Sequence, residues 1–299
     1  DDSVAEQIPT FATLKVRGED GSLLPLARPI TYRHLLLHTS GIYAYDGSFH
    51  DEGTWKEVME LEDLESLMRL LARQPLQHQP GERYTYGMST AVLGYLVERL
   101  SGQTLENFLT REIFEPLGMV DTQFGLSEED RQRFQPLSVW EQDHFREGTL
   151  VEDELYYRSG SALQLGGEGL VSTLEDYGRF CDMLANGGRT LQGRALIQPE
   201  TLQQMTQDQL GEIPGFDGAV KGRVLGFGFE ILQDPVQAKT QAPVGVYGWG
   251  GYHSTSFWID PLNQAYGLFL TRRYPYLDGL KDALQQVVYA PGALEQWSV

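Results

Sequence analysis

The sequence predicts an α+β fold in which helices come first along the chain and strands follow. Helical patterns dominate up to about residue 165, and strand patterns joined by short turns appear later. Strands linked in this way pair antiparallel, whereas a doubly wound parallel sheet needs strands that alternate with helices throughout. We therefore expect one domain made of two lobes: residues 1–165, mainly helical, and residues 166–299, mainly an antiparallel sheet.

Each helix expected in the first lobe has a polar cap at its start and glycine or proline near its end. One segment, "LEDLESLMRLLARQP", has apolar residues on one face before its proline: Leu61, Leu64, Met68 and Leu71. The other expected helices lie in "TYRHLLLHTSG", which begins at a Thr31 cap, in "STAVLGYLVERLSG" and in "TLENFLTREIFEPLGM". Residues 121–165 then turn polar and irregular, which indicates a long surface excursion near a site.

The second lobe is expected to begin with a glycine-rich turn and a helix, and to continue with strands. The helix lies in "GGEGLVSTLEDYGRFCDMLANGG", with Ser172 or Thr173 as its cap and Gly187 as its stop. A last helix, over about 277–289, is expected to close over the sheet. The three expected strands lie in "RVLGFGFEIL", "TSFWID" and "QAYGLFLTRR".

Composition and charge exclude several classes of partner. Of the 299 residues 41% are hydrophobic, and 42 acidic residues against 23 basic ones give a net charge of −19. Such a charge repels a nucleic-acid backbone and an anionic membrane surface, and we expect neither as a partner. No segment approaches the roughly 18 apolar residues of a membrane span, and "DDSVAEQIP" has no signal-peptide pattern. Localisation therefore stays open between periplasmic or secreted and cytoplasmic. The single cysteine, Cys181, excludes an intrachain disulfide and is expected to be buried.

Two candidate sites are weighed against simpler structural roles. Residues 87–91, "GMSTA", resemble a G-x-S-x-G nucleophile elbow in which Ser89 attacks and His253 completes a triad. The elbow normally follows several βα units, so we favour Ser89 as the cap of the next helix. His34 and His38 have the i, i+4 spacing of a metal site, but only leucines lie between them. We expect packing or capping histidines and no metal.

Tyr86 is a third candidate, as a proton-transfer group just before a helix. A phenol has a pKa near 10, so it acts as a base only where cations or a helix N-terminus favour the phenolate. The helix that begins near Ser89 supplies part of such a field. An ordinary packed tyrosine remains the alternative from these residues alone.

Five segments together resemble the serine β-lactamase and penicillin-binding-protein superfamily, most closely the class C β-lactamase-like esterases of the family VIII type. They are "ITYRHLLLHTSGI", "YGMSTAVLGYLVERLSG", "FLTREIFEPLGM", "GGEGLVSTLEDYGRFCDMLANGG" and "GWGGYHSTSFWIDP". They occur in the family's order over nearly the whole chain. The resemblance implies a β-lactamase-like fold and acyl transfer through a serine in S-x-x-K, with no cofactor.

The family's other site residues carry over by position. Tyr86 matches the family tyrosine that exchanges protons with the serine, and Tyr84 is the alternative if the register differs. Trp249, Gly250 and Gly251 match the third motif, after which the backbone N–H of Tyr252 would donate to the oxyanion. Lactamases usually carry asparagine where this chain has Met88 and lysine where it has Trp249. Without those polar groups, the resemblance implies an ester substrate more readily than a lactam.

The S-x-x-K motif is absent from these 299 residues, because no lysine follows a serine at that spacing. We expect a segment N-terminal to Asp1 to carry the nucleophile, its helix and the first strands of the fold, so that this segment is itself a partner. The expected substrate is a small ester or lactam. Four aromatic residues of the 121–165 segment either line its acyl pocket or belong to an ordinary surface loop: Trp140, Phe145, Tyr156 and Tyr157. The alternatives are a β-lactamase, a D-amino-acid peptidase, or an inert homologue that acts as a binding protein.

Overall fold

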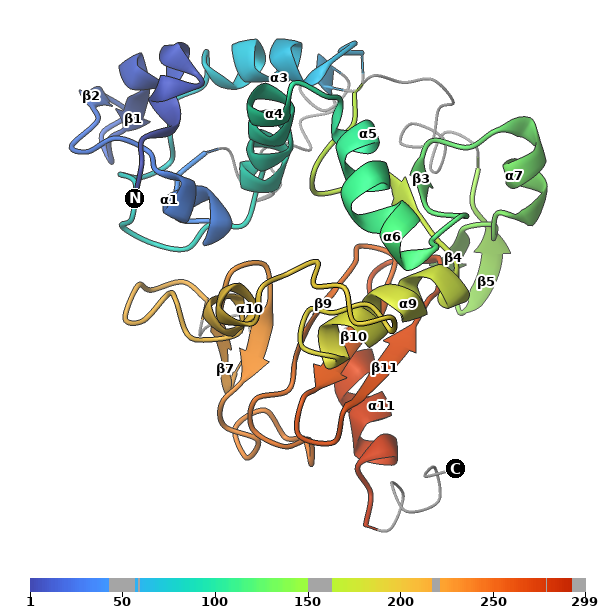
Figure 1. Cartoon of the computed structure of the whole chain (residues 1–299). Coiled ribbons are helices and arrows are strands. Elements are labelled where there is room, and N and C mark those ends of the chain that lie inside the picture. The colour runs from blue at the N-terminus through green and yellow to red at the C-terminus, as the bar shows by residue number, and fades with distance from the viewer. Residues whose placement is uncertain (43–56, 59, 150–162, 217–220, 278, 292–299) are drawn as a thin grey trace.

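The computed structural model describes residues 1–42, 57–58, 60–149, 163–216, 221–277 and 279–291. It has the predicted α+β architecture, with helices from the first half of the chain lying over an antiparallel sheet from the second half (Figure 1). The expected boundary at residue 165 stays a prediction, because small sheets pair strands from either side of it.

The expected helices form, and two of them are capped as predicted. Helix α1 (Tyr32–Leu36) begins after Thr31, whose hydroxyl accepts a hydrogen bond from the His34 N–H. Helix α9 (Leu174–Ala185) begins after Thr173, whose hydroxyl accepts from the Asp176 N–H. The other helical segments before α9 are η1 (Val4–Glu6), η2 (Pro9–Thr13), α3 (Leu64–Leu71), α4 (Ser89–Ser101), α5 (Leu105–Leu109), the π-helical η3 (Thr110–Phe114), α6 (Glu115–Leu117) and α7 (Glu128–Arg133).

One apolar cluster holds α3 against α4 and thereby fixes where α4 begins. Leu64 and Leu67 of α3 and Val92 of α4 are fully buried in this cluster, as is Met88 just before α4. Each buried apolar side chain of this size contributes roughly 1.5–3 kcal/mol relative to an exposed one. The chain that enters α4, including Tyr86, is therefore anchored to a rigid part of the molecule.

The main sheet has five antiparallel strands in the order β11-β10-β9-β8-β7. Helix α9 packs on β10 and β11 (Figure 1). Helix α11 (Leu280–Val288) packs through Leu284 and Val288 on a second cluster that includes Trp258. The expectation of three strands was incomplete, because "RVLGFGFEIL" folds into two strands and the Trp249 segment forms another. The strands are β7 (Arg223–Leu225), β8 (Glu230–Leu232), β9 (Tyr247–Gly250), β10 (Ser256–Asp260) and β11 (Ala265–Phe269).

Part of the polar excursion at 121–165 is ordered into small sheets. Strands β4 (Ser138–Glu141) and β5 (His144–Glu147) form a hairpin, and β12 (Arg273–Tyr274) pairs with β4. The described helices include none long and apolar enough to cross a membrane. Cys181 is buried as predicted. The remaining elements are β1 (Lys15–Arg17), β2 (Leu23–Pro25), β3 (Gln123–Phe124), β6 (Leu170–Val171) and α10 (Pro199–Met205).

Candidate active site

Tyr86 lies where the helical part of the chain meets the sheet. Its ring centroid is 6.2 Å from that of Trp249 on β9 and 4.7 Å from that of His38, which follows α1. About 40% of the Tyr86 side chain is exposed, so the ring is accessible from outside. The structure thus brings Tyr86 and Trp249 together, which the sequence could relate only by family resemblance.

Contacts between the two parts of the chain hold this pair in place. The Tyr84 N–H donates to the Pro214 carbonyl at 2.8 Å, and the Tyr84 ring packs edge-on against Phe216. Gly215 has a φ of +112°, and a Cβ on it would stand 2.7 Å from the Tyr84 carbonyl oxygen. Only glycine permits that approach. The strand-like segment before Tyr86 is therefore tied directly to the loop that faces it.

The environment of Tyr86 favours the neutral phenol. Burial raises the pKa of Tyr86, a hydrogen bond from the Trp249 side chain lowers it, and the negative charge of Glu168 raises it. The net shift is upward from 10. At neutral pH Tyr86 is therefore the neutral phenol, a form that can donate a proton but does not act as a base. The expectation that the start of α4 would favour the phenolate stays a prediction.

The Trp-Gly-Gly motif lies at the end of β9 and enters a tight hairpin turn. The Gly251 N–H donates to the Thr255 carbonyl at 2.9 Å, and the Ser254 N–H donates to the Gly251 carbonyl at 3.0 Å. A Cβ on Gly251 would stand 2.2 Å from Thr255 Oγ1, whereas one on Gly250 would make an ordinary contact at 3.4 Å. Tyr252 lies in the turn with 63% of its side chain exposed. The oxyanion role of the Tyr252 N–H stays a prediction.

His38 is a packing histidine, as expected, but the sequence did not indicate that it packs on Tyr86. Helix α1 ends at Leu36, and His38 has a left-handed φ of 51°. It therefore does not share a helix face with His34, as the i, i+4 spacing had suggested. The His38 ring packs on Tyr86, and its Nδ1 accepts a hydrogen bond from the Gly87 N–H at 3.4 Å. His38 thus fixes the orientation of the segment that carries Tyr86.

We expect His38 to make the protein sensitive to acid. Burial lowers the pKa of His38 from 6.5 to about 4, so the fold favours the neutral ring. The neutral His38 ring makes its full contribution to the free energy of unfolding above pH 6.5. That contribution, on the order of 3 kcal/mol, is lost as the pH falls toward 4. Urea unfolding of wild type and His38→Gln at pH 7 and pH 4 measures this. Wild type should lose more stability than the variant, and parallel losses would contradict the assignment.

Ser89 is neither a helix cap nor part of a catalytic triad in this structure. Met88 precedes α4 without a side-chain cap bond, and Ser89 is the first residue of the helix. Ser89 is only 1% exposed, and its hydroxyl is hydrogen-bonded to the Ser40 hydroxyl at 2.9 Å. The prediction of a cap was wrong because a distant serine supplies its partner. Met88 is fully buried as well, so its side chain does not line an accessible site.

Ser89→Ala should lower stability without abolishing ester hydrolysis. Removing the hydroxyl leaves Ser40 short of a buried partner, which costs about 1–2 kcal/mol of unfolding free energy. The double variant Ser40→Ala/Ser89→Ala should cost less than the sum of the single variants, because both single changes break the same hydrogen bond. Urea unfolding measures these energies. Loss of activity in Ser89→Ala with unchanged stability would instead favour the nucleophile elbow.

The other sequence candidates are placed as follows. His34 Nδ1 accepts a hydrogen bond from the Thr31 N–H, so His34 belongs to a capping box, and the packing and capping roles of both histidines are confirmed. Within the described ranges, no three His, Cys, Asp or Glu side chains gather as metal ligands would. Trp140 and Phe145 pack edge-to-face on the β4–β5 hairpin at 4.7 Å. Tyr156 and Tyr157 lie outside the described residues.

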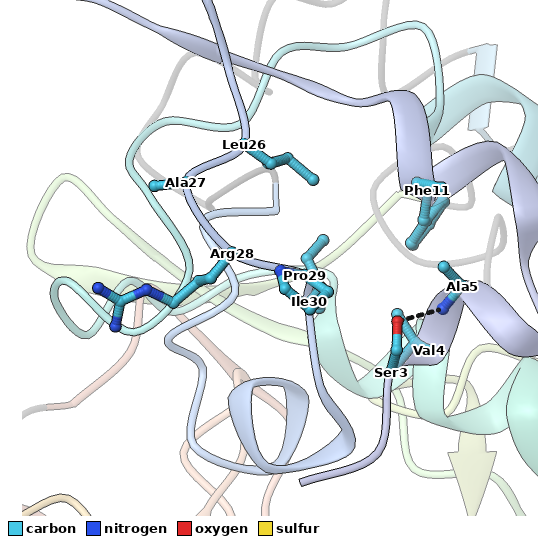
Figure 2. A pocket seen from close by; sticks show the side chains of 10 residues that line it. Ser3, Val4, Ala5, Phe11, Leu26, Ala27, Arg28, Pro29 and Ile30 are labelled. Atoms are coloured by element: carbon cyan, nitrogen blue, oxygen red, sulfur yellow. Dashed lines mark hydrogen bonds between the residues drawn. The ribbon is translucent and has the colours of Figure 1, made fainter.

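A separate pocket of about 360 Å³ lies beside the N-terminal segments (Figure 2). Its wall is mostly apolar, and Ser3 in that wall uses its hydroxyl to accept a hydrogen bond from the Ala5 N–H. None of the expected site residues line this pocket. It offers no pair of nucleophile and base, so the chemistry is better placed at Tyr86.

Comparisons with known proteins agree with this fold. A sequence model of the family described as Beta-lactamase matches residues 1–290. The Mycobacterium tuberculosis protein Rv1367c is 30% identical over 263 residues, which cover 85% of this chain and 65% of that protein, so the chain spans less than two thirds of this relative. Esterase EstB of Burkholderia gladioli is 30% identical over 315 residues, covering 97% of this chain and 75% of EstB. The solved structure of EstCE1, a hydrolase with promiscuous acyltransferase activity, matches with a TM-score of 0.79 and 25% identity, covering 97% of this chain and 78% of that one.

Proposed function

Because this chain belongs to the beta-lactamase family, whose relatives include esterases and acyltransferases, we propose that it forms most of a serine hydrolase that cleaves carboxylic esters. The observation that carries this proposal is the placement of Tyr86 beside Trp249, at the end of the strand that continues into Gly250, Gly251 and Tyr252. This placement supports the proposal, because the residue proposed to transfer protons and the residue proposed to bind the oxyanion come from the two facing parts of the fold.

The proposed reaction uses an acyl-enzyme. The lysine of an S-x-x-K motif takes the proton of its serine as the serine oxygen attacks the ester carbonyl, and the Tyr252 N–H donates to the oxyanion that forms. Tyr86, held as the neutral phenol, then donates a proton to the departing alkoxide and regains one from the lysine. Water attacks the acyl-enzyme in turn, and its proton returns to the serine as the carboxylic acid leaves. These 299 residues contain no S-x-x-K, so the proposal assigns the serine and lysine to polypeptide outside this sequence. We use "the complete protein" for the chain together with that segment.

We favour esters over lactams as substrates, because the chain lacks two polar side chains that would bind a lactam. Position 88 contributes a buried methionine to the core, so it offers no amide to a substrate. Position 249 contributes an indole that is engaged with Tyr86. A lactam antibiotic needs a cation for its carboxylate, and tryptophan supplies none. The similarity to EstB supports the same choice.

Steady-state kinetics of the complete protein tests the proposal. Hydrolysis of a short-chain p-nitrophenyl ester should have a larger kcat/KM than opening of a chromogenic cephalosporin. The reverse order would favour a β-lactamase. Absence of both activities, together with no labelling by a serine-directed phosphonate, would favour a binding protein.

A further inference from the structure

The turn that carries Tyr252 is joined to a tyrosine-bearing segment, 272–277. The Arg273 N–H donates to the His253 carbonyl at 3.2 Å, and the Leu277 N–H donates to the buried Ser254 hydroxyl at 2.8 Å. These bonds hold the segment beside the Gly250–Tyr252 backbone. The proposed oxyanion turn and this segment therefore form one surface.

Three tyrosines on this surface are exposed next to the motif. The side chains of Tyr252, Tyr274 and Tyr276 are 63%, 42% and 51% exposed. The rings of Tyr252 and Tyr274 lie 5.8 Å apart with a tilt of 37°. The Tyr276 hydroxyl lies 3.8 Å from the point where a Cβ on Gly250 would stand. We call these three residues the tyrosine surface.

The tyrosine surface is uncharged. Side chains alternate along a strand, so Arg273 and Tyr274 of β12 point to opposite faces. The Arg273 guanidinium lies 5.6 Å from the centre of the Phe145 ring and donates to the Pro275 carbonyl, which keeps its charge on the other face. The His253 ring lies 5.3 Å from the Tyr252 ring, and burial lowers the pKa of His253 from its usual 6.5, so this neighbour is also neutral at neutral pH. Adjacent exposed aromatic side chains of this kind are suited to stacking with a flat, neutral group.

We propose that Tyr252, Tyr274 and Tyr276 bind an uncharged aromatic ring close to the ester carbonyl, which makes esters with an aromatic ring next to the carbonyl carbon the preferred substrate class. The proposal rests on the proposed function, because Tyr252 supplies both the oxyanion donor and the first ring of the surface. A ring bonded near the carbonyl carbon therefore reaches the tyrosine surface while the carbonyl oxygen faces the Tyr252 N–H.

Equilibrium binding of ketones separates this proposal from catalysis, since a ketone is not hydrolysed. Isothermal titration of the complete protein should show roughly tenfold tighter binding of 2-acetonaphthone than of cyclohexyl methyl ketone, through ring stacking. Tyr252→Leu and Tyr274→Leu keep apolar area but lose the ring, and each should remove most of the preference. Tyr274→Phe should retain it. Tyr266→Leu, which changes an exposed tyrosine on β11 beside α9, should leave the ratio unchanged.

Equal affinity for the two ketones in wild type would overturn the proposal, as would a preference that survives both leucine variants. If a leucine variant does not fold by circular dichroism, the wild-type ratio and Tyr274→Phe still decide. A clear preference for the aromatic ketone in a protein without esterase activity would support the ring site and contradict the proposed function. Esterase activity without that preference would support the proposed function and contradict the ring site.

Discussion

Tyr86→Phe in the complete protein is expected to lower kcat for a short-chain p-nitrophenyl ester by about 10²–10⁴-fold, the usual contribution of a positioned proton donor. The phenyl ring keeps the packing on His38 and Trp249, so the fold should persist. The loss should appear in kcat more than in KM, because the proton is needed only after substrate has bound. Stopped-flow or steady-state ester hydrolysis measures both constants.

Tyr84→Phe is the matched control, since it removes a phenol two positions away in the same segment. The Tyr84 ring packs against Phe216, and burial raises the pKa of its hydroxyl strongly. This variant should keep kcat within a few-fold of wild type. If Tyr84→Phe loses activity and Tyr86→Phe does not, the register of the tyrosine motif is wrong and Tyr84 carries the chemistry.

Gly251→Ala should have the second large effect, a fall in kcat of about 10²-fold, comparable to removal of one oxyanion donor. The new methyl group would stand 2.2 Å from Thr255 Oγ1, so the turn or the threonine must move. A shift of the turn carries the Tyr252 N–H away from the position of the oxyanion. Ester hydrolysis, with thermal unfolding alongside, measures the effect.

Two further variants isolate the cause of that loss. Gly250→Ala adds the same methyl group at 3.4 Å from its neighbour, an ordinary contact, and should retain most of the activity. Gly251→Ala/Thr255→Ala removes the clashing hydroxyl and should recover much of the rate. Equal losses in Gly250→Ala and Gly251→Ala, with no recovery in the double variant, would argue against an oxyanion role for this turn.

Local chemistry explains why the helices could be predicted and the role of Ser89 could not. Thr31 and Thr173 cap helices through N–H groups three residues away, which is a pattern that a sequence displays. Ser89 stands at a similar place, but its hydroxyl pairs with Ser40, which lies far away in the chain. A long-range hydrogen bond leaves no periodic signal, so the capping rule gave the wrong partner.

The site shows the same division between local and long-range information. Family resemblance identified Tyr86 and Trp249, but their proximity depends on the packing of Tyr84 against the 213–216 loop. The histidine spacing drew attention to His38, yet its role depends on the end of α1 and on a left-handed backbone. Because β7 and β8 are short apolar runs close together in the chain, the sequence predicted them as a single strand segment.

The central claim is that this chain supplies the proton donor and oxyanion turn for a serine that it does not itself contain. Labelling of the complete protein with a fluorophosphonate, followed by peptide mass spectrometry, tests that claim most directly. We predict a single modified serine, in an S-x-x-K motif outside these 299 residues, with labelling slowed in Tyr86→Phe. Stoichiometric modification of Ser89, or of any other serine within the printed sequence, would contradict the claim.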